Sequence, residues 1–228
     1  GDVLERKYRV TATIVLVLLI VSVAFLRLGV RQPEVRFSEK RAFQEKAFYL
    51  TLGSGIFGGT IYYTLDGNNP TLDSKVYTEP ILIEEGLPNK VTVVKAARLQ
   101  GKELGEVYTQ TYFVGEGVSK LYDVMLVSLS ADSQVLYDEE TGILANYEKE
   151  SEDGEWDRPA YIEFYTSDGS LMLAQGTGIA VSGHGSRKYA QKSIKLISGT
   201  LYDNEHPTFD YDFFEEDMGG NQTNQSYN

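Results

Sequence analysis

The residues best suited to chemistry lie between 178 and 197, where a glycine-flanked basic loop separates two runs of β-type residues. The loop residues are Gly183, His184, Gly185, Ser186, Arg187 and Lys188. Glycines leave backbone N–H groups uncovered, and the loop adds a hydroxyl and fixed positive charge beside them. This combination of groups binds anionic ligands such as phosphate.

Two lysines follow the loop, Lys192 just before the second β-type run and Lys195 within it. Side chains alternate between the two faces of a strand, so Lys195 shares a face with Ser193. The residue types alone leave two interpretations open, a site for a phosphate-like anion or an ordinary solvated basic face. His184 is interpreted as a loop residue between glycines rather than as a catalytic base.

The composition of the chain limits its partners and its chemistry. The 228 residues carry a formal net charge of -12, and an acidic surface repels phosphate backbones, so we expect no nucleic-acid partner. The chain has no cysteine, which excludes disulfides, cysteine-bound zinc and thiol nucleophiles. Its two histidines leave little scope for a histidine-rich metal site or a histidine-based triad. The basic loop is therefore a local exception in an acidic chain.

The N-terminal region contains an apolar run that is just long enough to span a bilayer. Residues 10–26 carry no charge, and Arg6, Lys7 and Arg9 precede them. We therefore expect a cytoplasmic basic segment over 1–9, a transmembrane signal anchor over 10–30 and a linker over 31–39. The membrane contact is expected through 10–26, in a single-pass protein of the cell membrane whose C-terminal portion is extracytoplasmic. The alternative is a cleaved signal peptide, and the initial Gly leaves open that the natural N-terminus lies upstream.

From about residue 46 the chain alternates short β-type runs with turn residues. Five such runs in about 75 residues predict a small antiparallel sandwich. Asp66-Gly67 follows one run directly and indicates a hairpin-type turn. The predicted strands are 47–52, 60–65, 76–83, 91–99 and 108–114.

Three segments of this region resemble the immunoglobulin-like module at the C-terminus of chitobiase and β-hexosaminidase. They are Ile61–Thr71, Tyr77–Ile81 and Val93–Ala97. The resemblance implies an immunoglobulin-like β-sandwich over 40–115 that acts as an accessory or spacer module. Exposed aromatics such as Tyr62 or Tyr63 could contact cell-wall glycan, or they could be core and cross-strand contacts. Asp66, Asn68 and Asn69 are interpreted as a turn, with a calcium loop as the alternative.

A second unit is predicted over 119–228. Its predicted strands are 123–129, which is interpreted as buried, 161–166, 171–175, 178–182 and 193–197. The Ser-Asp-Gly-Ser sequence at 167–170 predicts a hairpin turn. After Gly199 the chain becomes acidic and aromatic, and its last ten residues have no apolar periodicity. We therefore expect the chain to end inside this domain.

Four segments of the second unit, in order, resemble the spore-coat-protein-H (CotH) kinase family over about 120–200. They are Leu126–Leu129 with Tyr137–Ile143, Trp156–Pro159 before the strand at 161–164, Gly178–Gly183, and Ser186-Arg187 with Gln191–Ser193. The family is a protein-kinase-like group that uses ATP and a divalent metal, Mg²⁺ or another, to phosphorylate proteins outside the cytoplasm. The resemblance implies the β-rich N-terminal part of an α+β protein-kinase-like domain.

The same resemblance implies roles for individual residues. The implied nucleotide-binding set is Lys192, Arg187, Ser186, Gly183 and Gly185. Lys192 is the expected phosphate-binding lysine, and phosphoryl transfer depends largely on positioning and charge neutralisation, which suits this set. Glu163 either pairs with Lys192, as a kinase lysine pairs with a glutamate, or points outward from its strand. The catalytic aspartate and the metal ligands are expected beyond the end of this chain, so no catalytic residue is assigned within it.

The fold class predicted for the chain is mainly β: a transmembrane helix, an immunoglobulin-like sandwich and part of a kinase-like domain. The predicted function of the full-length protein is transfer of the ATP γ-phosphate to Ser or Thr of a surface or coat protein. The alternative is a non-enzymatic surface adhesin, or a cell-wall glycan-binding protein, in which the second unit is a degenerate CotH-like scaffold.

Overall fold

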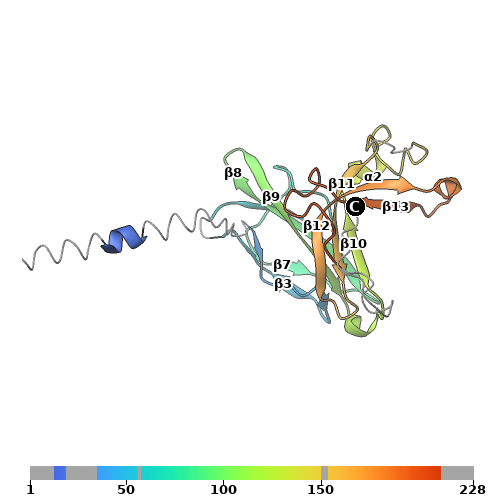
Figure 1. Cartoon of the computed structure of the whole chain (residues 1–228). Helices are drawn as coiled ribbons and strands as arrows, with labels where there is room; N and C mark the ends of the chain where they lie inside the picture. The colour runs from blue at the N-terminus through green and yellow to red at the C-terminus, as the bar shows by residue number, and fades with distance from the viewer. Residues whose placement is uncertain (1–12, 19–34, 56–57, 150–153, 212–228) are drawn as a thin grey trace, which may run out of the picture. The chain divides into compact units, whose positions relative to one another are not determined.

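The computed structural model describes residues 13–18, 35–55, 58–149 and 154–211 (Figure 1). Residues 34–228 group into one compact body, which contains both the sandwich and the second unit predicted over 119–228. Residues 13–18 are helical, and in the described part of the chain no helix is long and apolar enough to cross a membrane. The transmembrane helix in the predicted fold class is therefore corrected, because the described residues contain no membrane-spanning helix. The rest of the span predicted over 10–30, and the segment 1–9, lie outside the described residues.

Residues 36–114 form sheets that pack as a β-sandwich (Figure 1). The strands are β1 (Arg36–Phe37), β2 (Phe43–Gln44), β3 (Phe48–Leu50), β4 (Leu52–Gly53), β5 (Ile61–Thr64), β6 (Lys75–Val76), β7 (Ile81–Ile83), β8 (Lys90–Gln100) and β9 (Glu103–Val114). One sheet has the order β2-β9-β8-β5-β6, and β3-β7 and β1-β4 form separate two-stranded sheets. β2 runs parallel to β9, and the other strand pairs are antiparallel.

Two of the predicted strands of the sandwich are each divided in the structure. The run 76–83 forms β6 and β7, which belong to different sheets, and Pro80 between them has no N–H to donate to a ladder. The run 47–52 forms β3 and β4, which pair with β7 and β1. The core between the sheets comes from alternate positions, such as Val94 and Ala96 of β8. The side chains between them, including Lys95, therefore lie on the outer face of the five-stranded sheet.

The second unit contains a four-stranded antiparallel sheet with the order β10-β11-β12-β13 (Figure 1). Its elements are η1 (Val118–Lys120), β10 (Leu126–Ser130), α2 (Ser133–Tyr137), β11 (Arg158–Tyr165), β12 (Leu171–Ser182), η2 (Gly185–Lys188) and β13 (Ser193–Ile197). The predicted hairpin is present, with Gly169 at a φ of 83° between β11 and β12. The runs 171–175 and 178–182 form one strand rather than two, because Gly176 and Gly178 stay extended and paired with β11.

The burial of β10 is the reverse of what its apolar residues predict. Ser128 and Ser130 are buried, whereas Val127 is 50% exposed and Leu129 is 38% exposed. The interpretation of 123–129 as a buried strand is therefore wrong, because most of its apolar side chains are exposed. Side chains alternate along a strand, and the face that carries the two serines packs against the sandwich, where Ser128 bonds Thr111 of β9.

The five-stranded sheet of the sandwich and the four-stranded sheet of the second unit pack face to face. The outer face of the sandwich is therefore covered by the second unit. A shared apolar cluster joins them through Phe43, Phe113 and Tyr165, with Ala42, Val118, Tyr122 and Leu126 around these rings. The opposite face of the four-stranded sheet is covered at one end by α2 and at the other by Phe209. We call the contact between the two sheets the joint.

Candidate functional site

The basic loop predicted to bind phosphate connects β12 to β13 and contains the short helix η2. Gly183 opens the loop with a φ of 98°, a conformation that favours glycine. A Cβ at this position would also collide with Oγ of Ser186. The glycine therefore permits the chain to turn sharply and brings Ser186 against its backbone.

The two basic residues assigned to phosphate binding contact the same short segment, 147–149. Arg187 donates from Nε to the carbonyl of Gly183 and from Nη1 to the carbonyl of Lys149, the latter at 2.8 Å. Lys192 donates to the carbonyl of Tyr189 at 2.7 Å, and its Nζ lies 4.1 Å from the ring centroid of Tyr147. The structure thus brings Arg187 and Lys192 to one side of the loop.

Two further cations surround the neighbouring Trp156. Nζ of Lys149 lies 4.0 Å from the centroid of the Trp156 ring, and the guanidinium of Arg158 lies 5.0 Å from it. Arg158 is held in place by the carbonyls of Thr141, Glu155 and Asp157. Cations over aromatic faces are attracted by the ring quadrupole. Tyr147 and Trp156 thus each have a cation against the ring, and Lys149 contacts both Trp156 and Arg187.

The other candidates of the basic region are placed differently. Gly185 and His184 are exposed at the start of η2, and Lys188 is exposed at its end. Lys195 lies on β13 opposite Ala180 and is exposed. It is therefore separated from the loop and shares none of the contacts of Arg187 or Lys192.

Glu163 does not form the predicted pair with Lys192. It lies in the middle of β11, between Ser128 of β10 and Ala174 of β12, and its carboxylate faces the joint. The predicted outward orientation is also wrong, because Glu163 is only 1% exposed. The carboxylate accepts hydrogen bonds from the backbone N–H of Thr111 at 3.1 Å, from Oγ1 of Thr111 and from the hydroxyl of Tyr165 at 2.6 Å.

The burial of Glu163 governs its ionisation. Desolvation raises the pKa of the Glu163 carboxyl above its ordinary value, and the hydrogen bonds from Thr111 and Tyr165 oppose part of this rise. Burial disfavours the charged form, whereas donors to the carboxylate favour it. The raised pKa means that the folded protein holds the proton more tightly than the unfolded chain.

We expect this raised pKa to appear as a pH dependence of stability. A carboxyl whose folded pKa exceeds its unfolded value stabilises the fold fully below the unfolded pKa of about 4.3. That stabilisation is lost as the pH rises through the folded pKa. The unfolding free energy of the wild type relative to Glu163→Gln should therefore fall between acidic and neutral pH. Urea titrations of both proteins at several pH values measure this difference, and a constant difference would contradict the prediction.

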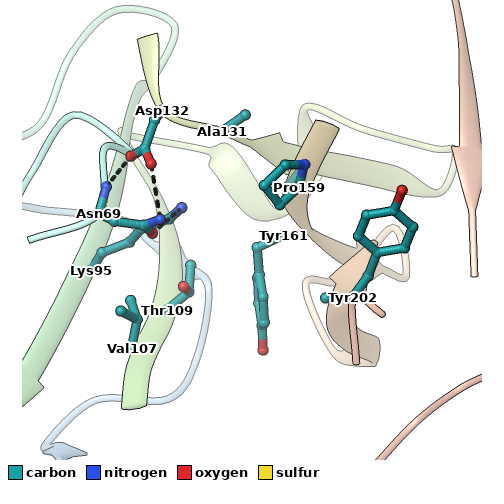
Figure 2. A pocket seen from close by; sticks show the side chains of 11 residues that line it. Asn69, Lys95, Val107, Thr109, Ala131, Asp132, Pro159, Tyr161 and Tyr202 are labelled. Atoms are coloured by element: carbon teal, nitrogen blue, oxygen red, sulfur yellow. Dashed lines mark hydrogen bonds between the residues drawn. The ribbon is translucent and has the colours of Figure 1, made fainter. Parts of the chain in front are cut away.

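A second polar cluster fixes the other end of the joint (Figure 2). Asn69 of the β5–β6 loop donates to Asp132 from its backbone N–H and, at 3.0 Å, from Nδ2. Its Oδ1 accepts from Nζ of Lys95 at 3.1 Å. Oδ1 of the adjacent Asn68 accepts the N–H of Ser133 at 2.7 Å, which caps the start of α2. The loop that contains Asp66-Gly67 therefore binds the second unit directly.

The same loop was interpreted as a turn, with a calcium site as the alternative. Asp66 accepts the backbone N–H of Asn68 at 3.1 Å and its Nδ2 at 2.8 Å, which is a local turn geometry. Among the residues that the structure describes, no group of three or more His, Cys, Asp or Glu could hold a metal ion.

The aromatic candidates for glycan contact in the sandwich are half-buried. Tyr63 packs against the sandwich core, and burial raises the pKa of its hydroxyl. Tyr62 lies in β5 between Ala97 of β8 and Val76 of β6. Both side chains therefore make cross-strand or core contacts, and contact of Tyr62 or Tyr63 with glycan stays a prediction.

The residues that join the two sheets were missed by sequence reasoning. Thr111 and Asp132 belong to no recognisable motif, and the segment Val93–Ala97 that contains Lys95 gives this lysine no predicted role. One signal was available, because Lys95 interrupts the apolar run Val93-Val94-Lys95-Ala96-Ala97. A strand that is apolar at successive positions is buried on both faces, so a lysine within it needs a buried partner.

Comparison with known families identifies part of the sandwich. Residues 50–112 match the family described as Fn3 associated. An immunoglobulin- or fibronectin-like associated module is thus supported within the predicted 40–115, and such a module is an extracellular-type β domain. The comparisons with curated proteins and with solved structures found no significant match. None of these comparisons supports the resemblance of the second unit to CotH kinases.

Proposed function

We propose that the loop 183–192 binds the phosphates of ATP and that the second unit is the β-rich part of a CotH-like protein kinase domain. One observation carries this proposal: Arg187 and Lys192 contact the same segment, 147–149, whose own Lys149 lies on Trp156. Positive charge is thereby concentrated in a chain with a net charge of -12. In the full-length protein the expected reaction is transfer of the γ-phosphate to Ser or Thr of a surface or coat protein.

The hydrogen-bonding capacity of the two basic side chains supports a ligand of this kind. An ammonium has three donors and a guanidinium has five. Within the described part of the chain, Lys192 uses one donor on Tyr189, and Arg187 uses two on Gly183 and Lys149. The remaining donors are held by these bonds near one place, so they can bind phosphate oxygens without much further ordering. ATP would supply the phosphoryl group.

The Fn3-associated module supports an extracytoplasmic setting for this activity. It is an extracellular-type β domain by its family match, and the second unit is bonded to it through Asn68, Asn69 and Thr111. The kinase-like sheet would therefore be carried in a defined orientation by the module. We propose a surface or coat protein as the substrate on the same grounds.

Calorimetric titration of the chain with ATP tests the assignment. Removing one charge-assisted hydrogen bond costs about 1.5–3 kcal/mol, so Lys192→Ala and Arg187→Ala should each weaken binding by about tenfold or more. Lys102→Ala is the matched control, since Lys102 is an exposed lysine in the β8–β9 turn of the other unit. Equal ATP affinity in the wild type and in both loop variants would contradict the assignment of the loop.

The Fn3-associated match also favours a second candidate, a non-enzymatic surface or glycan-binding role. In that case the chain would bind cell-wall glycan and would show no specific affinity for ATP. A pull-down on insoluble cell-wall glycan, with Tyr62→Ala compared with the wild type, distinguishes the two. Glycan retention that depends on Tyr62, together with absent ATP binding, would favour the scaffold over the kinase.

A further inference from the structure

A cavity of about 150 Å³ lies in the joint, and no residue of the basic loop lines it. Figure 2 shows Lys95, Asn69 and Asp132 on one side of this cavity and Pro159, Tyr161 and Tyr202 on the other. A cavity admits one water with about 10–15 Å³, so this cavity has space for roughly ten water-sized groups. It is large enough for a small ring-shaped molecule.

Lys95 is the unusual member of the polar side. It is only 3% exposed, and lysines are almost never this buried unless they are paired. Among the described residues it has no carboxylate within ion-pair distance, and its hydrogen bond to Asn69 uses one of three donors. Two N–H donors of a buried ammonium therefore remain for a ligand.

The charge of Lys95 is nevertheless balanced at longer range. Burial lowers the pKa of its ammonium, and the nearby carboxylates of Asp132, Glu163 and Asp66 raise it again. An anion entering the cavity would face these carboxylates, so the site does not select a net negative charge. Asp132 and Asn69 also present oxygen acceptors, which match the hydroxyl donors of an uncharged ligand.

Two glycines of β12 leave space for the aromatic side of the cavity. A Cβ at Gly176 would collide with the backbone oxygen of Tyr202, and a Cβ at Gly178 would lie 2.5 Å from the Tyr202 ring. The absence of these side chains lets Tyr202 lie directly against the strand. Together with Tyr161, it gives the cavity flat apolar surfaces opposite Lys95 and Asp132 (Figure 2).

We propose that this cavity binds a neutral, hydroxyl-bearing ring, a single sugar unit, between the two sheets. The hydroxyl groups of the sugar would accept hydrogen bonds from Lys95 and donate hydrogen bonds to Asp132 and Asn69. The apolar face of the sugar ring would lie on Tyr161 or Tyr202. The inference is independent of phosphate binding by the loop. Because both units contribute to the cavity, a bound sugar stabilises the joint as well as the fold.

Ligand-observed NMR on the whole chain tests the proposal. Glucose, galactose, mannose and N-acetylglucosamine are each added, and saturation transfer to the sugar is measured together with the melting temperature. We expect at least one sugar to receive saturation and to raise the melting temperature. Lys95→Met should weaken that binding by at least tenfold, and the exposed Lys102→Met should leave it unchanged. Chitobiose and maltose, added in parallel, distinguish a pocket for free monosaccharides from one for the terminal unit of a glycan.

Lys95→Met could disturb the joint itself, so a second variant keeps the test decisive. Thr109→Val changes a half-buried residue that lines the same cavity while retaining its shape, and it should also weaken sugar binding. Circular dichroism confirms that each variant is folded. The proposal is overturned if no sugar binds, if folded Lys95→Met and folded Thr109→Val both bind sugar as tightly as the wild type, or if inorganic phosphate binds at the cavity in preference to every sugar.

Discussion

Replacing Glu163 with alanine is expected to lower the free energy of unfolding by about 4 kcal/mol, although no sequence motif marks this residue. The change removes the acceptor of the Thr111 N–H and of the Tyr165 hydroxyl. Each buried polar group left without a partner costs about 1–3 kcal/mol, and the deleted atoms also leave a cavity. Urea unfolding followed by circular dichroism measures the loss.

Two further variants show whether the hydrogen bonds of Glu163 are the cause. Glu103→Ala changes an exposed glutamate at the start of β9 and should alter the unfolding free energy by less than about 0.5 kcal/mol. Glu163→Gln keeps one carbonyl acceptor and nearly the same volume, so its effect at neutral pH should be smaller than that of Glu163→Ala. A loss of stability in Glu163→Ala no larger than in Glu103→Ala would contradict the role of Glu163 in the joint.

Gly169→Ala should be the second most damaging of the substitutions considered, because it combines backbone strain with a collision across the joint. Gly169 has a φ of 83°, and a left-handed conformation costs a residue with a Cβ roughly 1–2 kcal/mol. The added Cβ would also lie 2.6 Å from the ring of Phe43 in β2, and overpacking of this kind costs about 1–3 kcal/mol. We expect a total loss of about 3 kcal/mol in urea unfolding.

Gly101→Ala separates the two causes. Gly101 occupies the β8–β9 turn with a φ of 65°, and a Cβ there would meet nothing within 4 Å. This variant carries the backbone strain without the collision, so it should lose only about 1–2 kcal/mol. In the double variant Gly169→Ala/Phe43→Leu, the loss of unfolding free energy should be smaller than the sum of the two single losses. The reason is that Phe43→Leu removes the ring that the new Cβ would touch. Equal losses at Gly169 and Gly101 would show that the turn of β11–β12 does not press on Phe43.

Sequence periodicity predicted most of the β structure, and its errors share one cause. The hairpin at 167–170 and the long strands β8 and β9 were predictable because alternation and turn residues are local signals. The division of 76–83 into β6 and β7, and the continuity of 171–182 as β12, depend on which partner strand is available. β10 illustrates the limit, since its apolar residues predict burial of Val127 and Leu129, whereas the structure buries Ser128 and Ser130.

The candidate site was predictable in composition but not in its surroundings. The residue types of the loop 183–192 are suited to anion binding, but they leave an ordinary solvated basic face as an equal interpretation. The packing of Arg187 and Lys192 on residues 147–149 brings together segments more than 30 residues apart in the sequence. Neither a turn signal nor an alternating pattern carries that information.

The sequence by itself determined the β-rich class, the sandwich module and the basic loop of this protein, because each depends on residues close together in the chain. Only the tertiary structure decided that Glu163, Thr111 and Lys95 are buried. Alternation assigns a side chain to one face of a strand, but it does not say whether that face meets solvent or another sheet. In this chain the face of the sandwich that could have been solvated meets β10, β11 and β12 instead. The joint is therefore polar. Charged side chains that the sequence alone suggests are exposed form buried contacts between its two sheets.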